Sequence, residues 1–140
     1  MIYILDASAL LNDENFSFSP KDAYFTTSLV FSEWKGFSSR ALAENAVSQG
    51  ALTIQDPCPL SIQKTIDKSA QSGTILSDPD ISIVALAAEF KGREANFTVL
   101  TDDYSVQNIL KKIGVKFIGA AQGEIKKHRN FGKKKKINKF

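Results

Sequence analysis

Short uninterrupted apolar runs alternate with longer amphipathic segments along this chain, and that alternation restricts its fold more than any other feature. The runs MIYIL at residues 1–5 and FTVL at 97–100 have strand length and are apolar on both faces. Such strands are typical of the centre of a parallel sheet that helices cover on both sides. With further strands expected at 22–28, 51–55 and 115–119, the sequence predicts a three-layer α/β/α domain with a mainly parallel central sheet of four to five strands.

The clearest helix is expected at residues 76–92, where apolar side chains recur at helical spacing: Ile81, Val84, Ala85 and Ala88. Asp78 is placed to cap this helix, and Pro79 fits its first turn. Another helix follows the second strand, and there Phe31 and Trp34 flank Glu33, which predicts a mostly buried carboxylate.

Composition narrows the classes of function. The only cysteine, Cys58, excludes an intramolecular disulfide and a cysteine-based zinc ribbon. No stretch approaches the ~18 to 20 continuous apolar residues that span a bilayer, and the N-terminus lacks a basic leader. We therefore expect a cytoplasmic protein that does not contact membranes.

The formal net charge of +3 conceals two parts of opposite sign. Residues 121–140 hold eight basic residues and one acidic residue, which gives +7 and leaves −4 for residues 1–120. We divide the chain accordingly into a folded domain at 1–120 and a basic, flexible C-terminal tail at 121–140. An acidic body with a basic tail predicts cation binding by the one and polyanion binding by the other.

Acidic residues follow the strands expected at the centre of the sheet or lie in the first turns of the helices after them. These residues are Asp6, Glu33, Asp80, Asp102 and Asp103. Ligands of open parallel sheets bind outside the carboxyl ends of the strands, so we expect these acids to converge on one cleft. Each close pair of like charges would cost ~4 kcal/mol at an effective dielectric constant near 20. A cation would relieve that repulsion.

Ligands that are all oxygen atoms favour Mg²⁺ or Mn²⁺ over zinc, and carboxylates that hold such ions are the equipment of phosphodiester hydrolysis. Each acid also has a structural interpretation. Asp6 and Asp78 can cap helices, either Asp102 or Asp103 can cap the helix that follows them, and Glu33 can be a surface residue. Because five acids are expected together at one edge, we favour the metal site over these structural interpretations.

Several motifs resemble those of PIN-domain ribonucleases, in the order expected of that family: ILDASALL, Glu33, LSDPDISIVALA and VLTDDYSVQN. The resemblance implies a PIN-like nuclease domain at 1–120 whose acidic quartet is Asp6, Glu33, Asp80 and Asp103. It implies Asp102 as an adjacent fifth metal ligand. It also implies supporting hydrogen bonds from Ser8 and Thr101, and support of the loop by Asn108.

Within the family, TDDYSVQN together with SSRALAENAVSQG and SGTILSDPD most resembles the NOB-type endonucleases that trim the 3′ end of small-subunit ribosomal RNA precursors. NOB-type proteins usually carry a zinc ribbon with two pairs of cysteines, which this chain lacks. Its basic tail would contact RNA phosphates instead, through Lys126, Lys127, Arg129, Lys133, Lys134, Lys135 and Lys136.

The sequence thus predicts a metal-dependent, single-strand endoribonuclease that processes precursor ribosomal RNA or acts on the small ribosomal subunit. PIN domains tend to dimerise, so the resemblance also implies a homodimer. One alternative is a VapC-type toxin ribonuclease with a partner protein, and another is a non-catalytic RNA-binding module of ribosome assembly. A phosphatase of the haloacid dehalogenase type is a weaker alternative, because its motif needs an aspartate where this chain has Ser8.

Overall fold

A five-stranded parallel sheet forms the centre of the molecule in a computed structural model that describes residues 1–13 and 15–119. The strand order is β3-β2-β1-β4-β5, and every pair of neighbours is parallel. The strands are β1 (Ile2–Leu5), β2 (Ala23–Thr26), β3 (Leu52–Ile54), β4 (Phe97–Leu100) and β5 (Phe117–Ile118). The predicted fold class and strand positions are confirmed.

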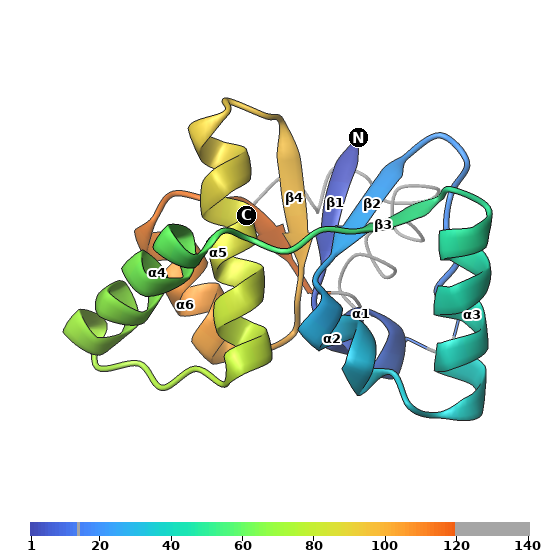
Figure 1. Cartoon of the computed structure of the whole chain (residues 1–140), viewed down its shortest axis with the longest axis horizontal. Helices are drawn as coiled ribbons and strands as arrows, with labels where there is room; N and C mark the ends of the chain where they lie inside the picture. The colour runs from blue at the N-terminus through green and yellow to red at the C-terminus, as the bar shows by residue number, and fades with distance from the viewer. Residues whose placement is uncertain (14, 120–140) are drawn as a thin grey trace, which may run out of the picture.

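Helices lie on both sides of this sheet. They are α1 (Ser8–Leu11), α2 (Ser28–Glu33), α3 (Phe37–Ser48), α4 (Pro59–Ser72), α5 (Asp78–Gly92) and α6 (Tyr104–Lys112). In Figure 1, α4, α5 and α6 gather on one side of the strands and α3 lies on the other. None of the helices in this described part of the chain has the length and apolarity needed to span a bilayer.

The chain changes direction across the sheet at β1, which lies between β2 and β4. In the register, Ile4 is opposite Phe25 on one side and Val99 on the other. All four residues of β4 are buried, as are the last two of β1. Since helices cover both faces, a continuous apolar run is what these strands require. The carboxyl ends of β1 and β4 therefore meet at the centre of one edge.

Helix α5 is buried around most of its circumference because it packs against α2, α4, α6 and β1. Residues 82–87 are all buried, whereas Ala88 is exposed, so the predicted apolar stripe described only part of the buried surface. The predicted cap by Asp78 is wrong. Ser77 caps the helix, and its hydroxyl accepts a hydrogen bond from the amide of Asp80.

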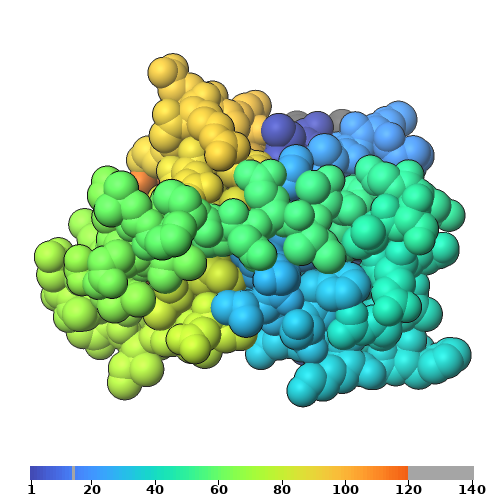
Figure 2. Space-filling model, viewed as in Figure 1, coloured from blue at the N-terminus to red at the C-terminus, as the bar shows by residue number. Residues whose placement is uncertain are grey.

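The connection from β3 to α4 crosses the face of the molecule seen in Figure 2, and side-chain hydrogen bonds hold it at both ends. The amide of Ser28, at the start of α2, donates to Oδ1 of Asp56 over 2.8 Å. The amide of Cys58 donates to Oε2 of Glu89, in the last turn of α5, over 2.7 Å. The start of α4 thus lies by the end of α5 that is remote from Asp80.

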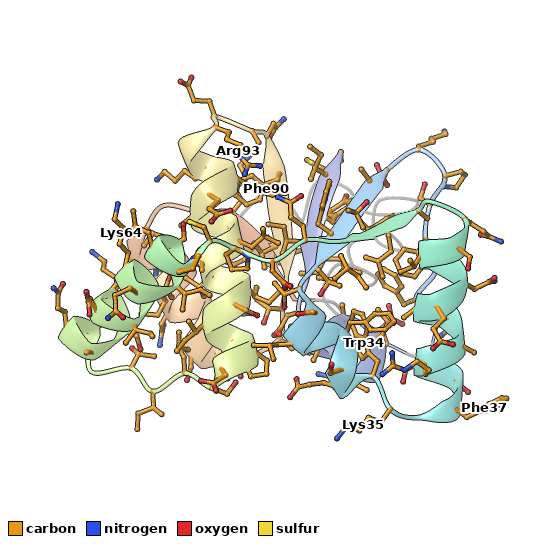
Figure 3. The ribbon with its side chains drawn as sticks, in the orientation of Figure 1. Trp34, Lys35, Phe37, Lys64, Phe90 and Arg93 are labelled. Carbon is orange, nitrogen blue, oxygen red and sulfur yellow. The ribbon has the colours of Figure 1, made fainter. Side chains whose placement is uncertain are left out.

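Trp34 directly follows α2 as its C-cap and turns its side chain into the core, where it is fully buried (Figure 3). Its indole Nε1 donates a hydrogen bond to the carbonyl oxygen of Ala7, 2.9 Å away. Val30 and Trp34 form the inward stripe of this short helix, and Glu33 does not lie on it. Glu33 is exposed, so the burial predicted from its apolar neighbours is wrong.

We expect Trp34→Phe to lower the free energy of unfolding by about 2 kcal/mol, because it removes a buried hydrogen bond and leaves space in the core. Urea denaturation followed by circular dichroism would measure the change. Phe37→Leu is the control: Phe37 is 92% exposed and should change stability by less than about 0.5 kcal/mol. Equal stabilities of Trp34→Phe and wild type would contradict this account of α2.

Candidate active site

Asp6 lies at the carboxyl end of β1 and is only 4% exposed. Its Oδ1 accepts a hydrogen bond from the amide of Ala7 over 2.8 Å, and its Oδ2 accepts one from the hydroxyl of Thr101 over 2.7 Å. Thr101 follows β4 and is itself fully buried. A buried carboxylate is costly unless it is hydrogen-bonded, so these two donors are what allow Asp6 to occupy this position.

Asp103 lies beside this pair and caps α6. Its Oδ1 accepts hydrogen bonds from the amides of Ser105 and Val106, over 2.8 and 3.1 Å. Its own amide donates to the hydroxyl oxygen of Thr101 over 3.1 Å. Thr101 thus connects Asp6 to Asp103 directly. Of the two aspartates that the sequence offered as a cap, Asp103 is the cap.

Asp80 lies in the first turn of α5 and completes a capping box with Ser77. Its Oδ2 accepts a hydrogen bond from the amide of Ser77 over 3.3 Å, while the Ser77 hydroxyl accepts one from the amide of Asp80. Asp80 therefore has a structural role that the sequence interpretation missed, because that interpretation gave the capping position to Asp78. The capping box is the [Ser/Thr]-x-x-[Asp/Glu] pattern, which Ser77 and Asp80 satisfy.

Electrostatics show that Asp6, Asp80 and Asp103 lie close to one another. Burial raises the pKa of Asp6 above its usual 3.8, and the charges of Asp80 and Asp103 add to the increase, while hydrogen bonds from Thr101 and Ala7 lower it. The net result is a pKa of about 6. Burial likewise raises the pKa of Asp80, and the charge of Asp103 adds to the increase. Within residues 1–13 and 15–119, none of the three carboxylates pairs with a basic side chain. The site therefore concentrates negative charge.

The other predicted site residues lie around this group. Asp102 is half-buried: its amide donates to the Ser8 hydroxyl oxygen over 2.9 Å, and its Oδ2 accepts from Nδ2 of Asn12 over 3.1 Å. Glu33, at the exposed end of α2, does not contribute to the pKa of Asp6 or Asp80. The electrostatic coupling thus joins three members of the predicted quartet, and the role of Glu33 stays a prediction.

Two side-chain amides that were not predicted as site residues form hydrogen bonds at the site. Asn108 is exposed on α6, and it is Gln107 whose side-chain amide donates to the carbonyl oxygen of Thr101, over 2.8 Å. Asn12, on the turn after α1, binds Asp102 across the edge of the sheet. The sequence did not indicate this contact, because the two residues are 90 positions apart in the chain. Both amides position backbone or carboxylate groups of the site.

The predicted RNA-binding residues of the tail lie outside the described residues, as does the rest of 120–140. They are Lys126, Lys127, Arg129, Lys133, Lys134, Lys135 and Lys136.

The molecule is a parallel α/β domain with carboxylates at the carboxyl edge of its central strands, and comparison with known proteins identifies its family. The model of the family described as "PIN domain of ribonuclease" matches residues 3–90 of this chain. The chain belongs to the PIN-domain ribonuclease family.

Relatives of known name include the protein called Endoribonuclease Nob1 in two archaea. That of Methanothermobacter thermautotrophicus is 36% identical over 81% of this chain and 66% of its own length. That of Methanocaldococcus jannaschii is 32% identical over 86% of this chain and 57% of its own length. The chain therefore spans less than two thirds of the length of these relatives.

A solved structure with the same fold is VapBC-1 from nontypeable Haemophilus influenzae, with a TM-score of 0.58 and 14% sequence identity over 86% of this chain and 99% of that one.

PIN-domain ribonucleases generally use divalent metal ions, and the donor set at this site fits such an ion. Asp80 and Asp103 each use one carboxylate oxygen as a cap, which leaves the second for a cation. Oxygen donors of this kind suit hard divalent cations. In the part of the chain that the structure describes, no three acidic, histidine or cysteine side chains are grouped tightly enough to hold an ion as they stand. Binding would therefore require some of the carboxylates to turn.

We expect the metal-free protein to become less stable as the pH rises from about 4 to 6. Because the pKa of Asp6 is raised to about 6, the folded protein binds more protons than the unfolded chain in this window. Asp6→Asn removes the charge and should stabilise the protein at pH 7 by as much as about 3 kcal/mol. Urea denaturation in EDTA at several pH values would measure both effects.

Asp67→Asn is the control for this measurement, because Asp67 is an exposed residue of α4. It should follow the wild-type dependence on pH. If Asp6→Asn were no more stable than wild type at pH 7, the buried carboxylate would not carry the cost that we assign to it.

Proposed function

We propose that this protein is a metal-dependent endoribonuclease that cuts single-stranded RNA. The observation that carries the proposal is the meeting of Asp6, Asp80 and Asp103 at the carboxyl edge of β1 and β4, where burial and mutual repulsion raise the pKa of Asp6 and Asp80. Membership of the PIN-domain ribonuclease family and relatives named endoribonucleases support the same reaction class.

The residues that we propose to hold Mg²⁺ or Mn²⁺ are Asp6, Asp80 and Asp103, with Asp102 and Glu33 as further candidate ligands. A divalent ion at this position supplies Lewis-acid activation of water and neutralises charge on the phosphate. Thr101 fixes the orientation of Asp6 by donating to Oδ2 and holds the amide of Asp103 at the same time. Ser8 holds the Asp102 amide in place.

In the proposed reaction a water molecule attacks the phosphorus in line with the leaving 3′ oxygen. The products are a 5′-phosphate and a 3′-hydroxyl. Because the 2′-hydroxyl of the RNA is not the nucleophile, a 2′-deoxy substitution at the cut should be tolerated. A 2′,3′-cyclic phosphate among the products would contradict this mechanism.

We infer that precursor small-subunit ribosomal RNA, cut at its 3′ end, is the substrate. Two observations support this inference: the TDDYSVQN motif is similar to that of NOB-type endonucleases, and the Nob1 relatives are 32 to 36% identical to this chain over most of its length. Ribonuclease VapC3 of Aeropyrum pernix is less similar, at 27% identity over 61% of this chain. A toxin of that kind is the alternative, and it predicts growth arrest on expression.

We expect Asp103→Asn to lower the rate of RNA cutting by about 100-fold or more, because it removes one charge from the proposed metal site. Asparagine is also a good N-cap, so α6 should keep its stability. The measurement uses a labelled RNA that spans the 3′ end of the small-subunit ribosomal RNA, with Mn²⁺ and with EDTA. Asp67→Asn, on the exposed face of α4, is the charge-matched control and should cut like wild type.

Three outcomes of this assay differ in meaning. Cutting that needs both metal and Asp103 supports the nuclease, and a cut at the mature 3′ end supports the ribosomal substrate. Cutting in EDTA, or equal cutting by Asp103→Asn, would contradict the proposed site. The absence of cutting by wild type would favour the RNA-binding module.

We expect removal of residues 126–140 to weaken RNA binding and to flatten its dependence on salt, because all seven of the proposed phosphate-contacting residues lie there. Filter binding at two salt concentrations would measure both quantities for the full chain and the shortened one. Asp103→Asn in the full chain is the comparison, and its affinity in EDTA should be no weaker than that of wild type. Unchanged affinity of the shortened chain would exclude the tail as the RNA-binding element.

A further inference from the structure

Two aromatic side chains are exposed in the described part of the chain, and both lie at the edge of the sheet that carries the acids. Phe37 is 92% exposed and Tyr104 is 83% exposed. The other aromatic residues within 1–13 and 15–119 are buried or half-buried, and most of them pack ring against ring. Phe37 and Tyr104 therefore lack the stabilisation by burial that the other aromatic residues have.

The chain reaches these two residues from strands on opposite sides of β1, the strand that ends at Asp6. Tyr104 is the first residue of α6 and follows the carboxyl end of β4, while Phe37 is the first residue of α3 and is reached through α2 from the carboxyl end of β2. Since β1 lies between β2 and β4, the segment that leads to Phe37 leaves the sheet on one side of Asp6 and the segment that leads to Tyr104 leaves it on the other. In Figure 3, Phe37 lies at the end of α3 nearest α2 and points away from the body of the protein.

The backbone that carries Tyr104 is held in place by the acidic site itself. Asp103, the preceding residue, caps α6 through the amides of Ser105 and Val106 and is tied to Thr101 through its own amide. Tyr104 is therefore attached to a fixed helix end immediately beside a proposed metal ligand. Near Phe37, the exposed Lys35 lies at the same edge (Figure 3), which adds a positive charge to that side.

We propose that Tyr104 and Phe37 stack against unpaired nucleobases of the RNA on the two sides of the phosphate that is cut. This inference rests on the proposed function and names how its substrate is held. The carboxylates at this edge repel the phosphate backbone of RNA. An aromatic ring can still bind a base there, because stacking does not depend on charge. Stacking is tolerant of sequence because every base has a π face, and it requires a single strand because a duplex hides those faces.

The first test compares leucine and phenylalanine at the same position. Tyr104→Leu should bind a short oligoadenylate roughly 5- to 100-fold more weakly than wild type, and Phe37→Leu should weaken binding in the same range. Tyr104→Phe keeps the ring and should bind like wild type. Binding is measured in EDTA by fluorescence anisotropy of labelled RNA, at two salt concentrations, because a stacking loss should persist when salt weakens phosphate contacts.

Leu60→Ala is the control for lost exposed apolar surface. Leu60 is 64% exposed in the first turn of α4, near the end of α5 that is remote from Asp80. It should leave the affinity unchanged. Equal affinities of Tyr104→Leu and Tyr104→Phe, with Phe37→Leu also equal to wild type, would overturn the proposal.

The second test reads stacking directly. In Tyr104→Trp, single-stranded oligoadenylate should quench the fluorescence of the new exposed indole, and the same RNA in a blunt duplex should quench it less. Trp34 is the only native tryptophan and is fully buried, so wild type supplies the background. Leu60→Trp carries an exposed indole away from the acids and should not be quenched. Equal quenching of the two indoles would contradict the inference.

Failure of this inference can be told apart from failure of the proposed function. If RNA cutting depends on Asp103 and metal while the leucine variants bind and cut like wild type, the nuclease stands and the stacking residues do not. If wild type does not cut RNA but the Tyr104→Trp indole is quenched by single strands alone, the stacking site stands and the nuclease does not.

Discussion

A buried carboxylate at the end of the central strand is the constraint on which the arrangement of this edge depends. Asp6 can remain there because the amide of Ala7 and the hydroxyl of Thr101 each donate to one of its oxygens. Thr101 sits at the end of β4, so the hydrogen bond that satisfies Asp6 also fixes the ends of two neighbouring strands to each other. The amide of Asp103 completes the connection by donating to the same hydroxyl oxygen. Any movement of one of these groups would leave another without its partner.

Buried hydroxyls continue this pattern toward the helices. Thr26, at the end of β2, donates its hydroxyl to the carbonyl oxygen of Leu5 over 2.8 Å. The hydroxyls of Thr27 and Ser82 bond to each other over 2.7 Å and join the start of α2 to α5. Small side chains that carry one donor and several acceptor sites can satisfy backbone groups in a close-packed interior where larger polar side chains would not fit. These hydroxyls bond β2 to β1, and they bond α2, which carries Glu33, to α5, which carries Asp80.

The sequence was sufficient for the fold and for the three acids that meet, because both follow from local patterns. Apolar runs identify the strands, and parallel strands deliver the residues after them to one edge. The prediction failed where the outcome depended on a single turn of helix. Glu33 is exposed because α2 ends at that residue and Trp34 turns inward in its place. The side chain of Gln107, and not that of Asn108, donates a hydrogen bond to Thr101. The two residues are neighbours on α6, so their side chains point in different directions, and the composition of the segment does not show which of them faces Thr101.

The double use of the acids changes how related sequences should be compared. Asp103 caps α6, Asp80 completes the capping box of α5, and Asp6 accepts two hydrogen bonds. Selection for a stable fold would therefore preserve an oxygen acceptor at each position even in a descendant that lacks the proposed activity. Asparagine or serine can cap a helix as well as aspartate does. Persistence of the negative charge, rather than of a polar residue, is the trace that catalysis would leave in such a lineage.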